Sequence, residues 1–249
     1  MTFNRRFLYA ALTSTLALLF HANAPAQSVD RSKTIKEIAS VRKQLSEKEK
    51  LFLSPSAEDQ AAFAEFLKQP NTGLIRLFPK GLYEDKLTIR GGGAYYSFTR
   101  LTHEYGAGHD LELQPVRTTE YAPPPIAEYY FLTGHGFIAV LGGVPLEKVT
   151  LEHDGVKFLA AYTPPSTTAE LSAEQRRARY GIDKNGYGYN RTAPVTVNYT
   201  YALRSINYGQ SDALVAFRVV RKEIDGSLVI LWKLLKQFSR PEPFRATSR

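Results

Sequence analysis

The spacing of apolar residues divides the chain into three parts. An uncharged apolar run lies near the N-terminus, a segment of helical period follows, and from residue 74 onward short β-branched and aromatic runs alternate with glycine and proline clusters. The pattern predicts an export signal over 1–26, a helical lead-in over 27–73, and an antiparallel β domain over 74–249.

The first predicted helix carries a one-sided apolar face. Its members recur at steps of three, four and seven residues: Ile35, Ile38, Val41, Leu45 and Phe52. We expect this face to pack on the main domain. A membrane-surface or partner-binding helix is the alternative, although both signs of charge on the polar face do not favour an anionic membrane.

A second helix is predicted from its end signals. Ser56 can cap it, and Glu58 and Asp59 lie in the first turn, where acids suit a helix N-terminus. Phe66 belongs to its apolar side, and Pro70 is a stop signal. The two helices together form the predicted lead-in.

The remainder reads as mainly β, α+β overall, in an antiparallel sandwich or barrel. We expect strands over 74–78, 86–90, 94–105, 110–116, 127–133, 137–141, 146–152, 156–163, 194–206, 213–222 and 228–238.

Two turns and one helix punctuate these strands. Asp225-Gly226 and Asp154-Gly155 each stand between apolar runs, which is typical of a β-hairpin because glycine adopts positive φ cheaply. One inserted helix is expected near 172–180, with Ser172 as its N-cap and Gly181 as its stop.

The N-terminus has the features of a secretory signal. Arg5 and Arg6 supply positive charge, the apolar run follows, and Ala24-Pro25-Ala26 matches a cleavage site. The run is short for a bilayer span, which needs about 20 apolar residues, and no later stretch approaches that length. We therefore expect a secreted or periplasmic protein without a transmembrane segment, exported by the general secretory route rather than the twin-arginine route.

Composition narrows the partners. The net charge is +8, and loss of Arg5 and Arg6 with the signal leaves +6. A modest positive charge suits anionic envelope polymers, or serves only solubility. No basic helix or stripe predicts nucleic-acid binding. The chain has no cysteine, which excludes disulfides, thiol nucleophiles and cysteine metal sites.

The densest chemical signal is the segment 101–113, LTHEYGAGHDLEL. We expect a hairpin with a three-residue loop, 106–108, which pairs Tyr105 with His109 and Glu104 with Asp110. A loop of even length is the alternative, because a shift of one residue turns every side chain of a strand over. The expected register gathers the histidines on one face and the acids on the other.

The carboxylates of this segment allow three interpretations. Glu104 and Asp110, directly opposed at about 5 Å, could act as the catalytic pair of a retaining glycosidase. With Glu112 they could instead bind Ca²⁺, which prefers oxygen ligands. The third interpretation is an exposed hairpin end where Arg100 relieves the repulsion. We expect His103 and His109 to be half-buried with local partners rather than metal ligands, since a zinc site needs a third protein ligand.

A second candidate surface lies in YGIDKNGYGYNR, residues 180–191. Tyr180, Tyr187 and Tyr189 could stack on sugar rings while Asn190 meets hydroxyl groups, and Arg100 is a further candidate ligand contact. A mobile surface loop without a ligand is the alternative. The three glycines 91–93 match neither a dinucleotide-binding nor a phosphate-binding loop, and we expect them to let the backbone bend.

The sequence contains no motif of a common exported hydrolase. It also contains no motif that requires a cofactor, so we expect the protein to bind no cofactor. The leading hypothesis is a non-catalytic binding or structural module of the bacterial-type cell envelope that binds glycans. The alternatives are a glycan-acting hydrolase that uses the carboxylate pair and a calcium-stabilised β domain.

Overall fold

The computed structural model describes residues 30–106, 108–116 and 129–242. The predicted signal over 1–26 lies outside these residues. The chain divides into two compact units, 1–42 and 43–249, and both sheets belong to the second.

The described residues form two antiparallel sheets. Sheet A has seven strands in the order β1-β11-β10-β9-β5-β7-β6, and sheet B has four in the order β2-β3-β4-β8. Sheet A consists of β1 (Thr72–Leu77), β5 (Gly136–Gly142), β6 (Ile182–Lys184), β7 (Tyr187–Asn190), β9 (Thr200–Asn207), β10 (Ser211–Lys222) and β11 (Leu228–Gln237). Sheet B consists of β2 (Tyr95–Tyr96), β3 (Leu111–Pro115), β4 (Tyr129–Leu132) and β8 (Thr192–Pro194). The predicted fold class is confirmed, as an open sandwich rather than a closed barrel.

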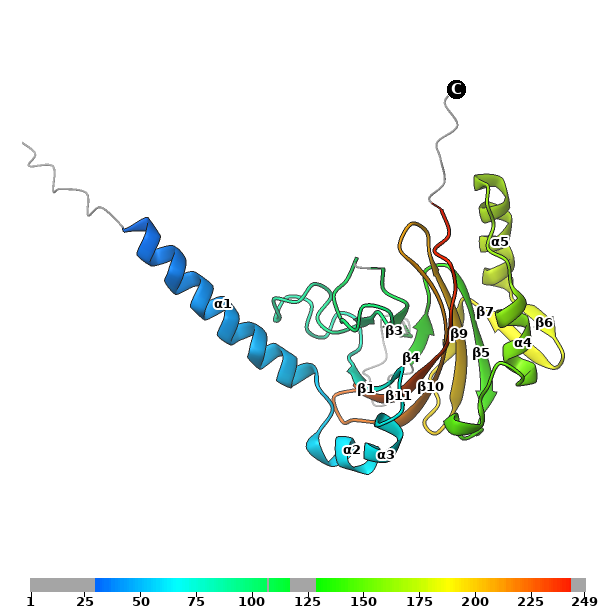
Figure 1. Ribbon diagram of the computed structural model, residues 1–249, viewed down its shortest axis with the longest axis horizontal. Helices are drawn as coiled ribbons and strands as arrows, with labels where there is room; N and C mark the ends of the chain where they lie inside the picture. The colour runs from blue at the N-terminus through cyan, green and yellow to red at the C-terminus, as the bar shows by residue number, and fades with distance from the viewer. Residues whose placement is uncertain (1–29, 107, 117–128, 243–249) are drawn as a thin grey trace, which may run out of the picture. The chain divides into compact units, whose positions relative to one another are not determined.

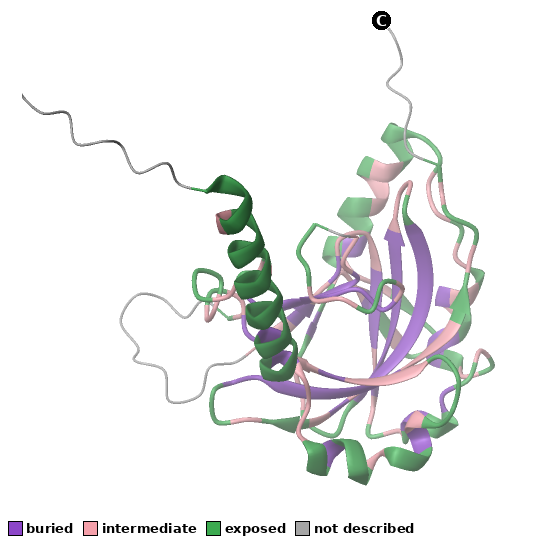
Figure 2. Cartoon of the chain, turned by 60° about the vertical axis from the view of Figure 1, so that its left-hand side comes forward, coloured by how far each residue is buried: buried purple, intermediate pink, exposed green. Residues whose placement is uncertain are grey.

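Sheet A is buried on both faces. One face packs against sheet B, and the other is covered by α4 (Asp154–Ala161) and α5 (Thr168–Tyr180) (Figure 1). Along β10, Val215 and Phe217 point to the first core and Leu214 and Ala216 to the second. This two-sided burial explains why β10 reads as a continuous apolar run (Figure 2).

One predicted turn and the predicted bend at the three glycines both form. The chain reverses between β10 and β11, where Gly226 has φ of 82° and Ser227 N–H bonds to Asp225, although the loop is longer than two residues. The three glycines 91–93 have φ of 86°, 57° and 82°, and a Cβ at Gly93 would collide with Leu53 and Phe78. Only glycine tolerates such a run at low cost.

The lead-in contains three helices, α1 (Arg31–Leu53), α2 (Ala57–Ala62) and α3 (Ala64–Leu67). Ser56 caps α2 as predicted, since its Oγ accepts from the backbone N–H of Asp59 at 3.1 Å. The predicted second helix is interrupted at Phe63, whose φ of −107° and ψ of 13° separate α2 from α3.

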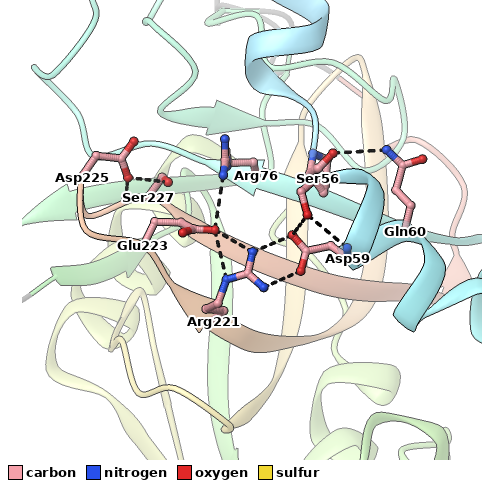
Figure 3. Close-up of polar contacts among 9 residues, drawn as sticks. Ser56, Asp59, Gln60, Arg76, Arg221, Glu223, Asp225 and Ser227 are labelled. Atoms are coloured by element: carbon pink, nitrogen blue, oxygen red, sulfur yellow. Dashed lines mark hydrogen bonds and ion pairs between the residues drawn. The ribbon is translucent and has the colours of Figure 1, made fainter.

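A polar network fixes α2 to sheet A (Figure 3). Arg221 of β10 donates to both carboxylate oxygens of Asp59, one at 2.6 Å, and to Glu223 at 2.7 Å. Arg76 of β1 donates to the same Glu223 oxygen at 3.3 Å. The side chain of Asp59 is 4% exposed, so this acid of the first helical turn is a buried anchor rather than a surface group.

Within the second unit, the expected packing of the α1 apolar face is only partly present, since Leu45 is 40% exposed. Of the residues in α1, only Glu49 and Leu53 are buried. Glu49 accepts from the backbone N–H and hydroxyl of Thr88, the latter at 2.6 Å, and Phe52 stacks on Phe78. These contacts, all within the second unit, lie in the last turn of α1.

Three predicted strands are wrong. Residues 86–90 form turns, 146–152 begin with a 3₁₀ turn at Leu146–Lys148, and 156–163 belong mostly to α4. Asp154-Gly155 therefore does not make a hairpin; it begins α4, which His153 caps by accepting from Gly155 N–H at 3.2 Å. A short apolar run does not distinguish a buried strand from a buried helix.

The inserted helix forms, but α5 begins before the predicted residue. Thr167 is its N-cap rather than Ser172, and a capping box joins Thr167 to Glu170. Gly181 ends the helix as predicted, with φ of 87°. The segment between α4 and α5 is therefore short, and it borders the groove that follows.

Candidate ligand-binding groove

A groove opens beside the connection between α4 and α5. It has a volume of about 650 Å³ and lies between that connection, the β9–β10 turn and the residues after β11. The rings of Tyr162, Tyr208 and Phe238 line it, and Arg240 and Glu242 stand exposed at its rim. Ligand sites in proteins occupy about 300–1,000 Å³, so the groove has room for a small molecule or a short oligomer.

The floor of the groove is a closed ion pair. Arg204 of β9 donates to both carboxylate oxygens of Asp212 on β10, and its third nitrogen donates to the carbonyl of Leu159 in α4 at 3.0 Å. The Phe238 ring covers the guanidinium. Burial raises the pKa of Asp212, and the bond from Arg204 opposes that rise. The floor is thereby internally satisfied and rigid.

Backbone chemistry shapes the walls. Pro164 and Pro165 have no backbone N–H, and they break the helical pattern between α4 and α5. The hydroxyl of Tyr208 donates to the carbonyl of Pro165 at 3.0 Å. Gly209 N–H bonds to the carbonyl of Pro241 at 2.8 Å, which holds the segment after β11 against the β9–β10 turn.

A small, mainly apolar hollow adjoins the groove through Tyr162, Pro165 and Tyr208, with a volume of about 20 Å³. Burial lowers the pKa of its His135, and the nearby Arg191 lowers it further. Burial and a hydrogen bond to Glu174 raise the pKa of Tyr162. The hollow has room for about one water molecule rather than a substrate.

The groove offers rings, hydroxyls and a rim charge of each sign. The carboxylates among its described lining residues are Asp212, committed to Arg204, and Glu242 at the rim. Such a lining can bind a polar ligand with apolar ring faces, and it does not present two facing carboxylates as a glycosidase requires.

The predicted register of the segment 101–113 is wrong. Tyr96 pairs with Leu111, and Ser97 forms a bridge with Thr102, so the chain reverses within 98–101 instead of continuing as a strand to Tyr105. Neither the odd nor the even loop describes this arrangement. A buried carboxylate joins this turn to the start of β3: Asp110 accepts from the backbone N–H of Phe98 at 2.7 Å.

Asp110 is a structural hub between the sheets. It is fully buried, and besides Phe98 it accepts from Ser97 at 3.3 Å and from Asn207 of β9 at 3.0 Å. Burial raises its pKa, and hydrogen bonds from Ser205, Phe98 and Ser97 act in the opposite direction. Glu104 is exposed, so one member of the proposed catalytic pair faces water while the other lies in the interior.

Glu112, the third candidate calcium ligand, forms an ion pair with a lysine side chain. It accepts from Lys80 Nζ at 2.9 Å and from Gln114 at 2.5 Å on the outer face of sheet B. Burial raises the pKa of neighbouring Tyr95 to about 12. In the ranges that the structure covers, no three His, Asp or Glu side chains gather as a possible metal site.

Both candidate histidines are at least half-buried with local partners. His103 Nε2 lies 2.8 Å from the carbonyl of Arg76, and its ring packs edge-on against Tyr96. The His109 ring contacts the rings of Tyr95 and Tyr105. Burial lowers the pKa of both imidazoles.

The tyrosine segment is a hairpin rather than a mobile loop. β6 and β7 pair around Asn185-Gly186, whose φ values are 53° and 78°. Asn-Gly between two strands is a strong hairpin signal, and the sequence reading missed it.

The candidate ligand contacts are dispersed. Tyr180 is 84% exposed at the end of α5, whereas Tyr189 is buried against Phe158. Tyr187 packs against His153, and Asn190 pairs with β5. Arg100 donates to Gln210 at 3.2 Å, outside the groove lining. Of the three candidate tyrosines, Tyr180 alone is exposed.

The sequence reading also missed the aromatic lining of the groove. Tyr162, Tyr208 and Phe238 are far apart along the chain and meet through the packing of α4 and the segment after β11. The Pro164-Pro165 pair was the one sequence feature that could have pointed to the groove, because two prolines indicate a fixed, extended connection.

Each helix in the described part of the chain is too short or too polar to span a bilayer. Comparison with known proteins yields no match among family models, curated proteins or solved structures, so the candidate function rests on the geometry of this chain.

Proposed function

We propose that this protein is an exported, non-catalytic binding module of the bacterial-type cell envelope, and that the groove beside α4 and α5 binds a glycan. The observation that carries the proposal is the pairing of aromatic rings with a polar rim over a rigid floor. Sugars present C–H groups to ring faces and hydroxyls to polar side chains. The net positive charge of the chain favours an anionic polymer over a neutral one.

Calorimetric titration of the mature chain with neutral and anionic cell-wall oligosaccharides tests the groove. We expect Tyr208→Ala and Arg240→Ala each to weaken binding about tenfold, which corresponds to about 1.4 kcal/mol. The matched control is Tyr180→Ala, which removes an exposed tyrosine outside the groove lining and should leave affinity unchanged. Melting temperatures show whether each variant is folded.

Two results would count against this assignment. If the chain binds none of the envelope oligosaccharides, the proposal that its ligand is a glycan is wrong. Loss of binding in Tyr180→Ala, with Tyr208→Ala unaffected, would move the contact surface to the C-terminal end of α5.

The proposed location has a separate test. Expression with residues 1–26 in a bacterial host should yield an extracytoplasmic protein whose N-terminus is Gln27 by mass spectrometry. Retention of the intact N-terminus in the cytoplasm would contradict export.

A further inference from the structure

Helix α1 presents an apolar stripe to solvent. Ile35, Ile38, Val41 and Leu45 are 66%, 46%, 61% and 40% exposed, and no residue of α1 before Glu49 is buried. Four large aliphatic residues in one line are more than the single exposed side chains that are ordinary on a protein surface.

Ion pairs among the described residues do not stabilise this part of α1. Asp30 caps it through the backbone N–H groups of Ser32 and Lys33, but none of the ion pairs in the described chain involves α1. Helical stability in proteins comes mainly from packing an apolar face, and short isolated helices are marginal in water. A partner that covers the stripe would supply the missing stabilisation.

Three residues of the stripe fit a coiled-coil seam, and the fourth, Ile35, flanks that seam at position e. With Ile38 and Leu45 at heptad position a, Thr34 and Val41 fall at position d, which leaves the opposite side of the helix polar. The seam ends at Lys48, the next d position, close to the point where Glu49 joins the main domain. About one and a half heptads are therefore available for a partner helix.

The charges beside the seam are self-complementary. Glu37 lies at position g and Arg42 at position e, five residues later, and neither forms an ion pair within the described residues. In a parallel pair of identical helices, position g of one chain faces position e of the other, five residues on. Each Glu37 then meets an Arg42 of the other copy.

We propose that α1 mediates parallel self-association, with Thr34 to Leu45 forming a short coiled-coil seam against the same helix of another copy. A membrane surface suits this helix less well. Its apolar stripe is narrow, its flanks carry both signs of charge, and its first aromatic residue, Phe52, stacks on Phe78. The β-branched d residues favour three or four chains over two.

Sedimentation velocity of the mature chain, over a range of concentrations, tests this proposal. We expect a mass two to four times that of one chain at high concentration, and a single-chain mass for Ile38→Lys. The matched control, Ser40→Lys, adds the same charge on the polar side of α1 and should associate like the parent. Both positions are exposed, so near-ultraviolet dichroism of the β domain should be unchanged.

A charge exchange tests the parallel direction. Glu37→Arg and Arg42→Glu should each weaken association, and the double variant Glu37→Arg/Arg42→Glu should restore it. Failure of the double variant to recover would overturn the parallel arrangement. A parent chain that stays monomeric at every concentration would overturn self-association, and its flotation with phosphatidylglycerol vesicles would assign the stripe to a membrane instead.

Discussion

Arg204 and Asp212 form a two-point ion pair on the helix-covered face of sheet A, with 1% and 2% of their side chains exposed. The pair joins neighbouring strands, and the third nitrogen of Arg204 reaches the last turn of α4. A cation at the C-terminal end of a helix also meets the negative end of its dipole. This buried pair therefore links two strands of sheet A to α4, and it forms the floor of the groove.

Arg204→Met should destabilise the protein by about 3–5 kcal/mol, because it leaves the Asp212 carboxylate buried without a partner. Urea denaturation measures the change. The double variant Arg204→Met/Asp212→Leu should recover much of the loss, since an apolar replacement of both partners costs far less than breaking the pair. Equal losses in the single and double variants would show that the pair is not coupled.

Asp59 should stabilise the protein in a pH-dependent way. The bond from Arg221 lowers its pKa below the ordinary value of 3.8. The stabilisation is present above pH 3.8 and is lost as the pH falls through that value toward the lower folded pKa. The stability difference between the parent and Asp59→Asn should therefore shrink on acidification in a denaturation series. Glu65→Gln, in an exposed ion pair, is the control and should change little.

Asp110 should show the opposite dependence. Burial raises its pKa above the ordinary value of 3.8, so the folded state binds a proton more tightly than the unfolded state. Its contribution to stability should fall as the pH rises from 3.8 through the folded pKa. The same denaturation series on Asp110→Asn checks this: relative to the variant, the parent should lose stability across that window. A parent that gains stability there would mean that the hydrogen bonds outweigh burial.

Glu112 and Glu104 should respond very differently to the same change. Glu112→Gln weakens a buried bond to Lys80 and should cost about 1.5–3 kcal/mol, the usual range for a charged hydrogen bond. Glu104→Gln changes an exposed side chain and should stay within about 0.5 kcal/mol. Thermal melting compares the two. A loss of glycan cleavage in Glu104→Gln, with stability intact, would revive the hydrolase alternative.

Several elements were predictable because local signals and burial agree. The β10–β11 hairpin joins two long apolar runs at Asp225-Gly226, and the paired runs bury residues on both of their faces. The Ser56 cap and the Gly181 stop likewise act through the backbone of their own helix. Such features depend on residues a few positions apart, which a single sequence displays.

Other elements depended on partners distant in the chain. The run around Val156 is apolar enough for a strand, and it becomes α4 because Val156 and Leu159 meet the helix-side core. Nothing in the sequence around Asp110 indicates that Phe98 and Asn207 donate hydrogen bonds to its carboxylate. The expected alternation of side chains along the strand therefore failed at this residue.

The sequence alone determined an antiparallel β protein with a helical lead-in, since apolar period and turn residues act over short distances. The tertiary structure alone decided which polar groups are buried and which rings share a groove. Tyr162, Tyr208 and Phe238 come together only when α4 and the chain after β11 pack on sheet A. Desolvation and proximity between distant segments are properties of the folded chain, and they decided every candidate site.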